Sequence, residues 1–316
     1  MPGCVSAAMS TPNSSTTTSD VGNTTIILKK LFCGATSGAI TKTCIAPLER
    51  VKIVQQIAGM RQDQAQHYRG MIPTFRYLLT TEGTVSLWNG NLANVLRVIP
   101  VYGLKFGLND VYNEFAQTLW PGDSHSHLWV RGMLAGTAAG LSQSSITYPL
   151  EVIRTRLSLG KGLGLEHTTI VQCTKNIAAT EGISGFYKGI SATLVTGAPY
   201  VGLQMTSYSA LKNLLPIDPE TGKPPLLWTL PAGAIAGIFA QTVTYPGDTL
   251  RRRMQINGAN GAARQYSTTW DCAKQILAKE GWAGMFAGAG TNCVRAIPGA
   301  AIQFFVYDAT KHLLGL

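Results

Sequence analysis

One short motif occurs three times in the sequence, and this repetition constrains the fold more than any other feature. Each copy has a proline, an acidic residue two positions later and a basic residue three positions after that. The copies are Pro47-Leu48-Glu49-Arg50-Val51-Lys52, Pro149-Leu150-Glu151-Val152-Ile153-Arg154 and Pro246-Gly247-Asp248-Thr249-Leu250-Arg251. Because repetition at a nearly fixed period indicates a fold built from equivalent units, we expect three similar units along this chain.

Each motif is followed by the same two elements, an acid–glycine pair and then an aromatic segment that ends in glycine. The pairs and segments are Glu82-Gly83 with Leu87-Trp88-Asn89-Gly90, Glu181-Gly182 with Phe186-Tyr187-Lys188-Gly189, and Glu280-Gly281 with Met285-Phe286-Ala287-Gly288. A single hexapeptide would be weak evidence of a repeat. Three copies in register, each with the same continuation, are strong evidence.

The composition favours a membrane protein over a soluble one. Of the 316 residues, 45% are hydrophobic and 13% are charged, whereas about a quarter of the residues in soluble domains are charged. The 34 glycines and 15 prolines point the same way, because membrane helices carry more of both than soluble helices do. Residues 189–211 and 226–247 contain no charged side chain, and both stretches are long enough to span a bilayer.

Glycines that recur every fourth residue before the motif prolines, such as Gly132, Gly136 and Gly140, let neighbouring membrane helices approach closely. We therefore predict that each repeat consists of a spanning helix, a short amphipathic helix and a second spanning helix. The predicted spans lie near 29–58, 90–118, 128–158, 189–214, 227–256 and 286–314, and the short helices near 71–81, 168–180 and 267–279. The fold class is an all-α membrane protein of three pseudo-symmetric repeats, 29–120, 127–215 and 226–316, after a disordered Ser/Thr-rich tail at 1–28.

An even number of spans places both termini on the same side of the membrane. The loops between the first and second span of each repeat hold Arg61, Arg69, Arg76, Lys161 and Arg264. Because basic residues concentrate in loops that are not translocated, this pattern places these loops and the short helices on the matrix or cytoplasmic side.

Other classes of protein receive little support. The six cysteines are far apart without a CxxC motif, so neither a disulfide framework nor a zinc site is expected. The net charge of +10 comes from basic residues scattered within apolar stretches, which disfavours nucleic-acid binding. The five histidines lie in loops or near the C-terminus without the spacing of a catalytic or metal site, which disfavours an enzyme.

On the strength of the tripled P-x-[DE]-x-x-[KR] motif, residues 29–316 resemble the mitochondrial carrier family. The resemblance implies that the protein is an antiporter and not an enzyme. It also implies a pseudo-threefold bundle with a central substrate site and two ionic gates that open alternately. It further implies a monomer in the inner mitochondrial membrane with both termini facing the intermembrane space. The membrane of another organelle, such as the peroxisome, is the less favoured location.

The resemblance implies that the motif charges form the gate on the matrix side. The implied pairs are Glu49 with Arg154, Glu151 with Arg251, and Asp248 with Lys52. Gln56 and Gln255, nine residues after their prolines, match positions that brace this ring in the family, whereas Ser158 occupies the third such position. These six charges could serve only to hold the bundle together. Apolar packing would do this at least as well as buried ion pairs, so a ring that separates during transport explains the charges better.

The opposite, cytoplasmic gate is incomplete in this sequence. Its candidate residues are Asp110, Lys212, Asp308 and Lys311. Asn113 stands where the family pattern has a base, and Ser209 stands where it has an acid. If the acid of each repeat pairs with the base of the next repeat, Asp110 with Lys212 is the one pair whose two residues are both present. We therefore expect this side to close less firmly than the matrix side.

Polar rows on the second span of each repeat predict the central site, because residues four apart share one helix face. Arg97, Thr196 and Arg295 each stand three residues before a proline and so occupy equivalent levels. Lys105 lies on the same row as Arg97, and Lys42 adds a cation from the first span. Several cations with few acids at one level predict an anionic ligand, and planar Arg groups suit phosphate or carboxylate.

Lys42, Arg97, Tyr200 and Arg295 match substrate-contacting positions of ADP/ATP carriers, and Tyr200 either stacks on a purine or only packs. The run 251–254, Arg-Arg-Arg-Met, resembles the start of their RRRMMM signature, although Thr196-Gly197 departs from their usual glycine–aliphatic pair. We expect exchange of phosphorylated anions, foremost adenine nucleotides. Carriers of coenzyme A, ATP-Mg/phosphate or thiamine pyrophosphate stay open as alternatives, and a non-transporting scaffold is the remote one.

No metal or cofactor is expected, but the turns before the second spans resemble the family's cardiolipin sites. The residues concerned are Gly90, Lys188, Gly189 and Gly288. Backbone N–H groups at the helix N-termini would hold the lipid phosphates there. The expected partners are thus a small anion and membrane lipids, without nucleic acid.

Overall fold

The computed structural model describes residues 16–60, 67–68, 70–119, 125–159, 169–216 and 224–315, and these parts are helical with turns between the helices. Six helices are long: α1 (Thr16–Ile57), α3 (Asn91–Leu119), α4 (His125–Leu159), α6 (Ile190–Asn213), α7 (Leu226–Ile256) and α9 (Ala289–Leu313). Three are shorter: α2 (Met71–Glu82), α5 (Ile170–Glu181) and α8 (Thr269–Met285). The order of long, short and long helix occurs three times, as the tripled motif predicts.

The predicted boundaries agree closely with the observed helices except at the N-terminus. Helix α1 begins at Thr16, so the prediction of a disordered tail up to residue 28 is wrong for residues 16–28. No proline follows Pro12 in this segment, and the apolar residues 26–28 continue directly into the helix. Residues 1–15 lie outside the described part of the chain.

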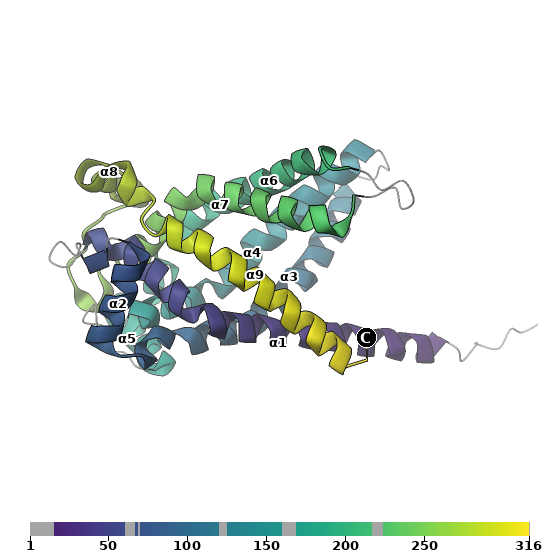
Figure 1. Cartoon of the computed structure of the whole chain (residues 1–316), viewed down its shortest axis with the longest axis horizontal. Helices are drawn as coiled ribbons and strands as arrows, with labels where there is room; N and C mark the ends of the chain where they lie inside the picture. Colours follow the sequence, from purple (N-terminus) through teal and green to yellow (C-terminus); the bar gives the residue numbers. More distant parts are fainter. Residues whose placement is uncertain are drawn as a thin grey trace, which may run out of the picture.

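The bundle has one closed end and one open end (Figure 1). We call the end that carries α2, α5 and α8 the closed end; at the opposite, open end the long helices diverge, and the C-terminus lies there. Neighbouring long helices pack as α1 with α9, α3 with α4 and α6 with α7. The motif prolines Pro47, Pro149 and Pro246 lie inside α1, α4 and α7, where a missing N–H and a steric clash bend a helix.

The turns between the short helices and the second long helices depend on glycine. Gly83, Gly182 and Gly281 have φ of +83°, +67° and +68°, and Gly90, Gly189 and Gly288 have φ of +80°, +82° and +82°. Residues with a Cβ rarely adopt these angles, so the acid–glycine pair and the aromatic–glycine segment of each repeat specify this turn. Gly281 also interrupts the helical path of α8, so the regular part of that helix ends near the predicted residue 279.

Buried apolar clusters fix the short helices against the motif helices at the closed end. Leu78 of α2 belongs to a cluster with Val51, Ile177 of α5 to one with Val152, and Ile276 of α8 to one that contacts Leu250. Burial of side chains of this size stabilises the arrangement by about 1.5–3 kcal/mol each. The short helices therefore form a fixed layer around the ends of α1, α4 and α7.

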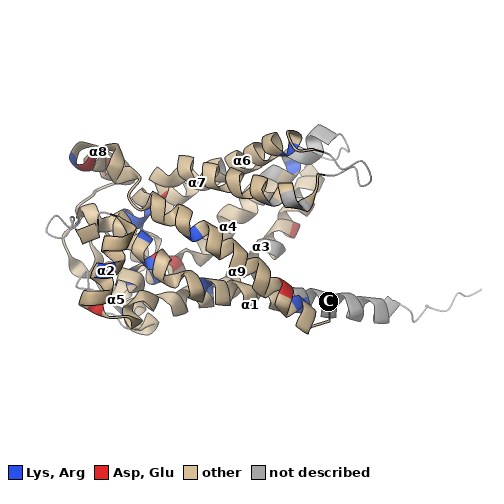
Figure 2. Ribbon diagram, in the orientation of Figure 1, with Lys and Arg blue, Asp and Glu red and all other residues tan. Residues whose placement is uncertain are grey.

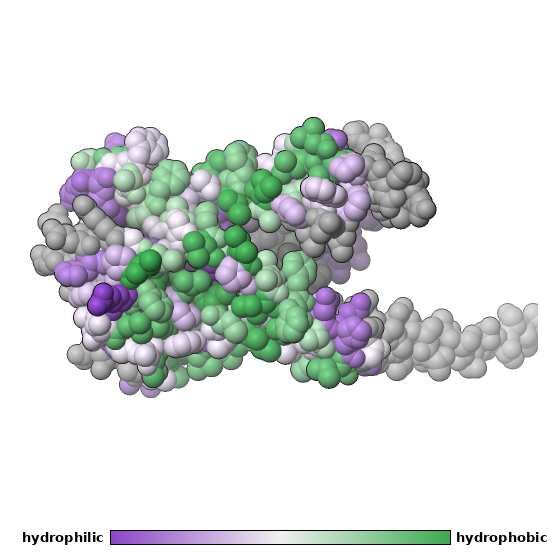
Figure 3. Space-filling model, viewed as in Figure 1, coloured by the Kyte–Doolittle hydropathy of each residue, from purple (hydrophilic) through white to green (hydrophobic). Residues whose placement is uncertain are grey.

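The outer surface is rich in large apolar side chains. Val195, Ile297 and Phe305 are 73%, 71% and 76% exposed, and Figure 3 shows apolar residues spread over the surface between the two ends of the bundle. Among the described residues, however, no helix is both long enough and apolar enough by hydropathy to cross a membrane.

Candidate functional site: the charged ring at the closed end

Charged residues gather on the helices near the closed end and again at the open end (Figure 2). The group near the closed end consists of the motif residues, which α1, α4 and α7 bring together just after their prolines. All three predicted ion pairs are present: Arg154 contacts Glu49, Arg251 contacts Glu151, and Lys52 lies 3.4 Å from Asp248. The pairs link α1 to α4, α4 to α7 and α7 to α1, so they close a complete ring.

Glu49 collects additional donors from other helices. The ammonium of Lys42 lies 3.2 Å away, and one guanidinium nitrogen of Arg295 lies 3.0 Å away, both at the oxygen Oε1. Asn94 of α3 donates to the other oxygen, Oε2, at 3.1 Å. Asn292 holds Arg295 in turn, because its side-chain oxygen accepts from Nη2 of that arginine at 3.1 Å. Glu49 therefore joins residues of α3, α4 and α9 to α1.

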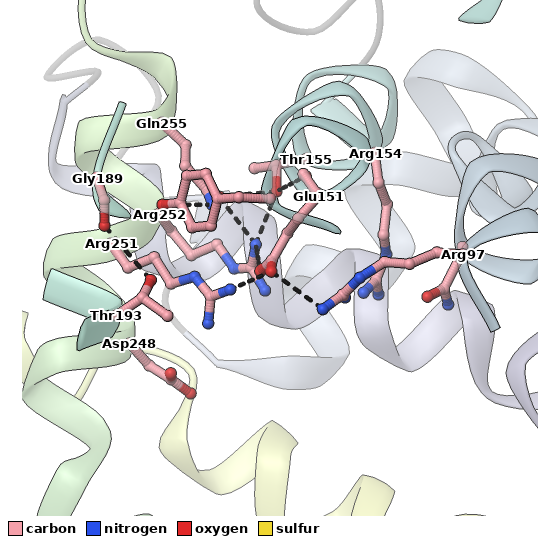
Figure 4. Close-up of polar contacts among 12 residues, drawn as sticks. Arg97, Glu151, Arg154, Thr155, Gly189, Thr193, Asp248, Arg251, Arg252 and Gln255 are labelled. Atoms are coloured by element: carbon pink, nitrogen blue, oxygen red, sulfur yellow. Dashed lines mark hydrogen bonds and ion pairs between the residues drawn. The ribbon is translucent and has the colours of Figure 1, made fainter. Parts of the chain in front are cut away.

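Glu151 forms the centre of a second group (Figure 4). Besides Arg251, it contacts Arg97 of α3 at 3.2 Å and Arg252 of α7 at 3.1 Å. Arg252 also donates to the hydroxyl of Thr155 at 2.7 Å and to the side-chain oxygen of Gln255 at 2.9 Å. The sequence alone predicts no role in the ring for Arg252 or Asn94, although the arginine run 251–253 is a signal for the former.

The two predicted brace residues differ in their surroundings. Gln255 is fully buried, accepts from Thr155 at 2.8 Å and donates to the hydroxyl of Tyr148 at 3.2 Å. Gln56 is also fully buried, and its backbone carbonyl accepts from Arg253 at 3.0 Å. At the third position, the backbone carbonyl of Ser158 accepts from Arg50 at 2.8 Å. Arg156 donates to the backbone carbonyl of Gln255 at 3.2 Å, so this position receives an arginine in every repeat.

A second layer of ion pairs, which the sequence analysis did not predict, surrounds this ring. Each repeat buries one arginine against the glutamate of its acid–glycine pair: Arg50 with Glu82 at 2.6 Å, Arg156 with Glu181 at 2.5 Å, and Arg253 with Glu280. Glu82 and Glu181 are the last residues of α2 and α5, and Glu280 stands directly before the break in α8 at Gly281. The layer therefore fixes each short helix to the motif helix of its own repeat.

Electrostatics at Glu181 shows how this layer is stabilised. Burial opposes ionisation of the carboxyl, but hydrogen bonds from Arg156 and Lys188 outweigh it and hold the pKa of Glu181 below its usual range. Two buried thiols, one on α5 and one on α8, behave in the opposite way, because burial raises the pKa of Cys173 to about 11 and that of Cys272 to about 12. These thiols are therefore inert packing residues at neutral pH.

The predicted substrate residues separate into two groups. Lys42, Arg97 and Arg295 meet the gate carboxylates, as described above. Thr196 and Tyr200 lie on α6 and are half-buried; the hydroxyl of Thr196 donates to the carbonyl of Ala192 at 2.7 Å. Gly197 lies beside Leu141 at ordinary packing distance. The side chain of Lys105 lies outside the described residues.

At the open end the structure does not form the predicted pair of Asp110 with Lys212. These two residues, Asp308 and Lys311 are all exposed, and none of the four makes an ion pair with another described residue. The long helices that carry these residues diverge at this end (Figure 1). An open cytoplasmic side is what alternating gates require when the ring at the closed end is formed, so the pairing of Asp110 with Lys212 stays a prediction for the opposite conformation.

The three turn glycines begin α3, α6 and α9, but their surroundings are unequal. Lys188 is not free beside Gly189, because its ammonium contacts Glu181 at 2.5 Å and the backbone carbonyl of Asn257 at 2.7 Å. Beside Gly288, by contrast, a cavity of about 810 Å³ opens between repeats 3 and 1. Its lining includes Gly70 and Met71, where α2 begins.

A helical bundle of three repeats closed by a ring of motif charges defines a class of protein, and comparison with known families agrees with it. The family profile described as "Mitochondrial carrier protein" matches residues 23–119, 125–218 and 222–316, so the chain belongs to the mitochondrial carrier family. Members of this family are transporters, and membership implies six membrane-spanning helices.

Among its relatives is the "Mitochondrial substrate carrier family protein ancA" of Dictyostelium discoideum, 32% identical over 91% of this chain and 94% of that protein. The "ADP,ATP carrier protein" of Schizosaccharomyces pombe is 32% identical over 98% of this chain and 96% of that protein. The "Mitochondrial coenzyme A transporter SLC25A42" of Xenopus tropicalis is also 32% identical, over 91% and 86%. Equal similarity to relatives with different substrate names leaves the substrate unresolved.

Proposed function

We propose that this carrier exchanges phosphorylated anionic metabolites, foremost adenine nucleotides, across the inner mitochondrial membrane by alternating access. The observation that carries the proposal is the convergence of Lys42, Arg97 and Arg295 from three helices at the ring. These cations hold the gate acids in this conformation, and a polyphosphate entering from the open end would compete with Glu49 and Glu151 for them. Arg groups suit this exchange because their planar donors bind phosphate and carboxylate alike.

Exchange by reconstituted protein tests this proposal. In liposomes preloaded with ADP, we expect uptake of labelled ADP by the wild type, uptake only in the presence of internal nucleotide, and loss of uptake in Arg97→Ala and Arg295→Ala. Arg76→Ala is the matched control, because Arg76 is exposed on α2 and outside the ring. Absence of flux for any anion, together with tolerance of both ring substitutions, would support a non-transporting scaffold.

A second candidate substrate is coenzyme A, which the names of relatives such as the Xenopus tropicalis transporter suggest. Coenzyme A and ADP share a phosphorylated adenosine, so the same cations and Tyr200 would serve for both. A thermal-shift screen of the purified carrier would separate these ligands from ATP-Mg and thiamine pyrophosphate, because a ligand that binds the folded state raises its melting temperature. If coenzyme A raised the melting temperature more than any other ligand, coenzyme A would become the proposed substrate in place of adenine nucleotides.

The proposed orientation places the open end and both termini toward the intermembrane space, and α2, α5 and α8 in the matrix. The ring is then the matrix gate, and Asp110, Lys212, Asp308 and Lys311 supply the weaker gate on the other side. The carrier would act as a monomer, since all three repeats lie in one chain. A cysteine placed at exposed position 72 of α2 tests the orientation: in intact mitochondria it should resist an impermeant maleimide and react after the membrane is permeabilised.

Cardiolipin is the proposed bound lipid, and the cavity beside Gly288 is its best-supported site. The N-termini of α2 and α9 both face this cavity, and unpaired N–H groups at helix N-termini attract phosphate. The turns at Gly90 and at Gly189 with Lys188 are weaker candidates. Addition of cardiolipin to delipidated protein should raise its melting temperature, and a Gly288→Ala variant, strained at φ +82°, should lose most of that gain.

A further inference from the structure

The three seams of the ring are held by unequal sets of contacts. By seam we mean the contact between two motif helices: α1 with α4, α4 with α7, or α7 with α1. Each seam has one acid–base pair and one arginine that donates to a backbone carbonyl of the next repeat. The differences lie in what each seam holds beyond this shared minimum.

The α4–α7 seam is the most heavily bonded of the three. Arg252 reaches across it to Glu151 and Thr155, and Thr155 donates to the side chain of Gln255 at 2.8 Å. Lys188 of the repeat 2 turn adds a hydrogen bond to the carbonyl of Asn257, directly after α7, at 2.7 Å. Glu151, at the centre, has a side chain only 3% exposed.

The acid of the α7–α1 seam is the most exposed of the three and has the fewest ion-pair partners, although Lys52 also lies 5.1 Å from the ring centroid of Tyr245 on α7. Asp248 has one ion-pair partner among the described residues, Lys52, at 3.4 Å. Its side chain is 32% exposed, compared with 9% for Glu49 and 3% for Glu151. The cavity beside Gly288 lies along this same boundary between repeats 3 and 1.

Side-chain chemistry reinforces this difference. A lysine is a hydrated point charge on a flexible stem, whereas an arginine offers several donors in a fixed plane and loses less freedom for each hydrogen bond formed. A partly exposed pair is also screened by water and contributes little, whereas a buried and hydrogen-bonded pair is costly to break. The α7–α1 seam should therefore need the least free energy to separate.

We propose that Arg252 is a positioning residue that holds repeats 2 and 3 together, so that the closed end parts first between α7 and α1. Arg252 lies outside the acid–base motif, and its three acceptors belong to the α4–α7 seam or to α7 itself. The inference concerns the order in which the ring opens. It does not depend on which anion the carrier transports, because it rests on contacts within the protein alone.

Distance measurements between spin labels test this order without any substrate. Ile72, Val171 and Trp270 are each the second residue of a short helix and are all exposed, so they mark the three repeats at equivalent places. In full-length carrier with the six native cysteines replaced, labels are introduced as cysteines in the pairs 72/171, 171/270 and 72/270. Double electron–electron resonance on the reconstituted protein then reports the width of each distance distribution.

We expect the 72/270 distribution to be the broadest and the 171/270 distribution the narrowest. Since both pairs share position 270, local motion of α8 cannot produce the difference, and the 72/171 pair controls for motion of α2. Arg252→Gln should broaden 171/270 while leaving 72/171 unchanged, Arg252→Lys should broaden it less, and the exposed control Arg76→Gln should change nothing.

Equal widths for all three wild-type pairs would overturn the proposal, as would a 171/270 distribution that is the broadest or that does not respond to Arg252→Gln. If Arg252→Gln does not fold, the wild-type widths and a strengthened seam decide the matter. The double variant Lys52→Arg with Asp248→Glu should narrow 72/270 alone, and no narrowing there would count against the assignment of the weak seam.

Discussion

The two ends of the bundle use the same kinds of charged residue in opposite ways. At the closed end Glu49 and Glu151 are nearly buried and each contacts three cations. At the open end Asp308 and Lys311 are exposed and make no ion pair with any described residue. The difference shows that the charges themselves do not decide whether an end is shut; their removal from water and the convergence of the helices do.

Physical chemistry explains why an ionic ring suits an end that must open. A buried ion pair stabilises a structure little more than apolar packing would, because desolvation of both charges offsets their attraction. When the helices separate, water hydrates both partners, and much of the desolvation free energy is recovered. The second layer is different, since Arg50, Arg156 and Arg253 fix helices within one repeat and need not separate during transport.

Neutralising one acid of the closed end should produce the largest effect. Glu151→Gln leaves Arg97, Arg251 and Arg252 without their common carboxylate, and an uncompensated buried charge costs about 3–5 kcal/mol. We expect a marked fall in the melting temperature of the purified carrier. Asp308→Asn is the matched substitution at the open end and should change stability by less than about 1 kcal/mol. Equal effects at the two ends would contradict the contrast between them.

Acid should weaken the second layer by a smaller amount. The folded-state pKa of Glu181 is depressed, so its contribution is fully present above the pKa of the unfolded carboxyl, about 4.3, and is lost as the pH falls through the folded value. Glu181→Gln should therefore cost about 1–3 kcal/mol at neutral pH, as expected for hydrogen bonds to a charged group. Thermal unfolding of both proteins from pH 7 downward should show the gap closing. A gap that widens in acid would mean that Glu181 is not ionised.

Much of the fold and of the ring could be predicted from the sequence, because both depend on residues that repeat. The proline positions, the glycine turns and the cyclic pairing of Glu49, Glu151 and Asp248 follow from three aligned copies of one motif. The helix boundaries follow as well, apart from residues 16–28, where a Ser/Thr-rich composition concealed a helical continuation.

Contacts that break the threefold pattern could not be predicted in this way. Arg252 has no counterpart with the same role in the other repeats. The ammonium of Lys188 contacts Glu181 and the carbonyl of Asn257, so it is not free to bind a ligand beside the turn. The convergence of Arg97 and Arg295 on the gate acids also depends on how far the helices have closed. Composition and spacing carry no information about that distance.

The smallest expected effect comes from completing the open-end ring. The sequence lacks a base at Asn113 and an acid at Ser209, and both positions lie on the second long helix of their repeats. Introducing Asn113→Lys and Ser209→Glu would offer partners to Asp308 and Lys311 when the open end closes. Because such pairs are partly exposed, each should add about 1 kcal/mol or less to the conformation with that end shut.

Spin labels at the open end should report this shift as a larger short-distance population. The charge-swapped variant, Asn113→Glu with Ser209→Lys, is the matched control, because it places like charges opposite each other and should reduce that population. If both variants shift the distances in the same direction, the change would reflect altered packing, and the incomplete gate would not explain why this end stands open.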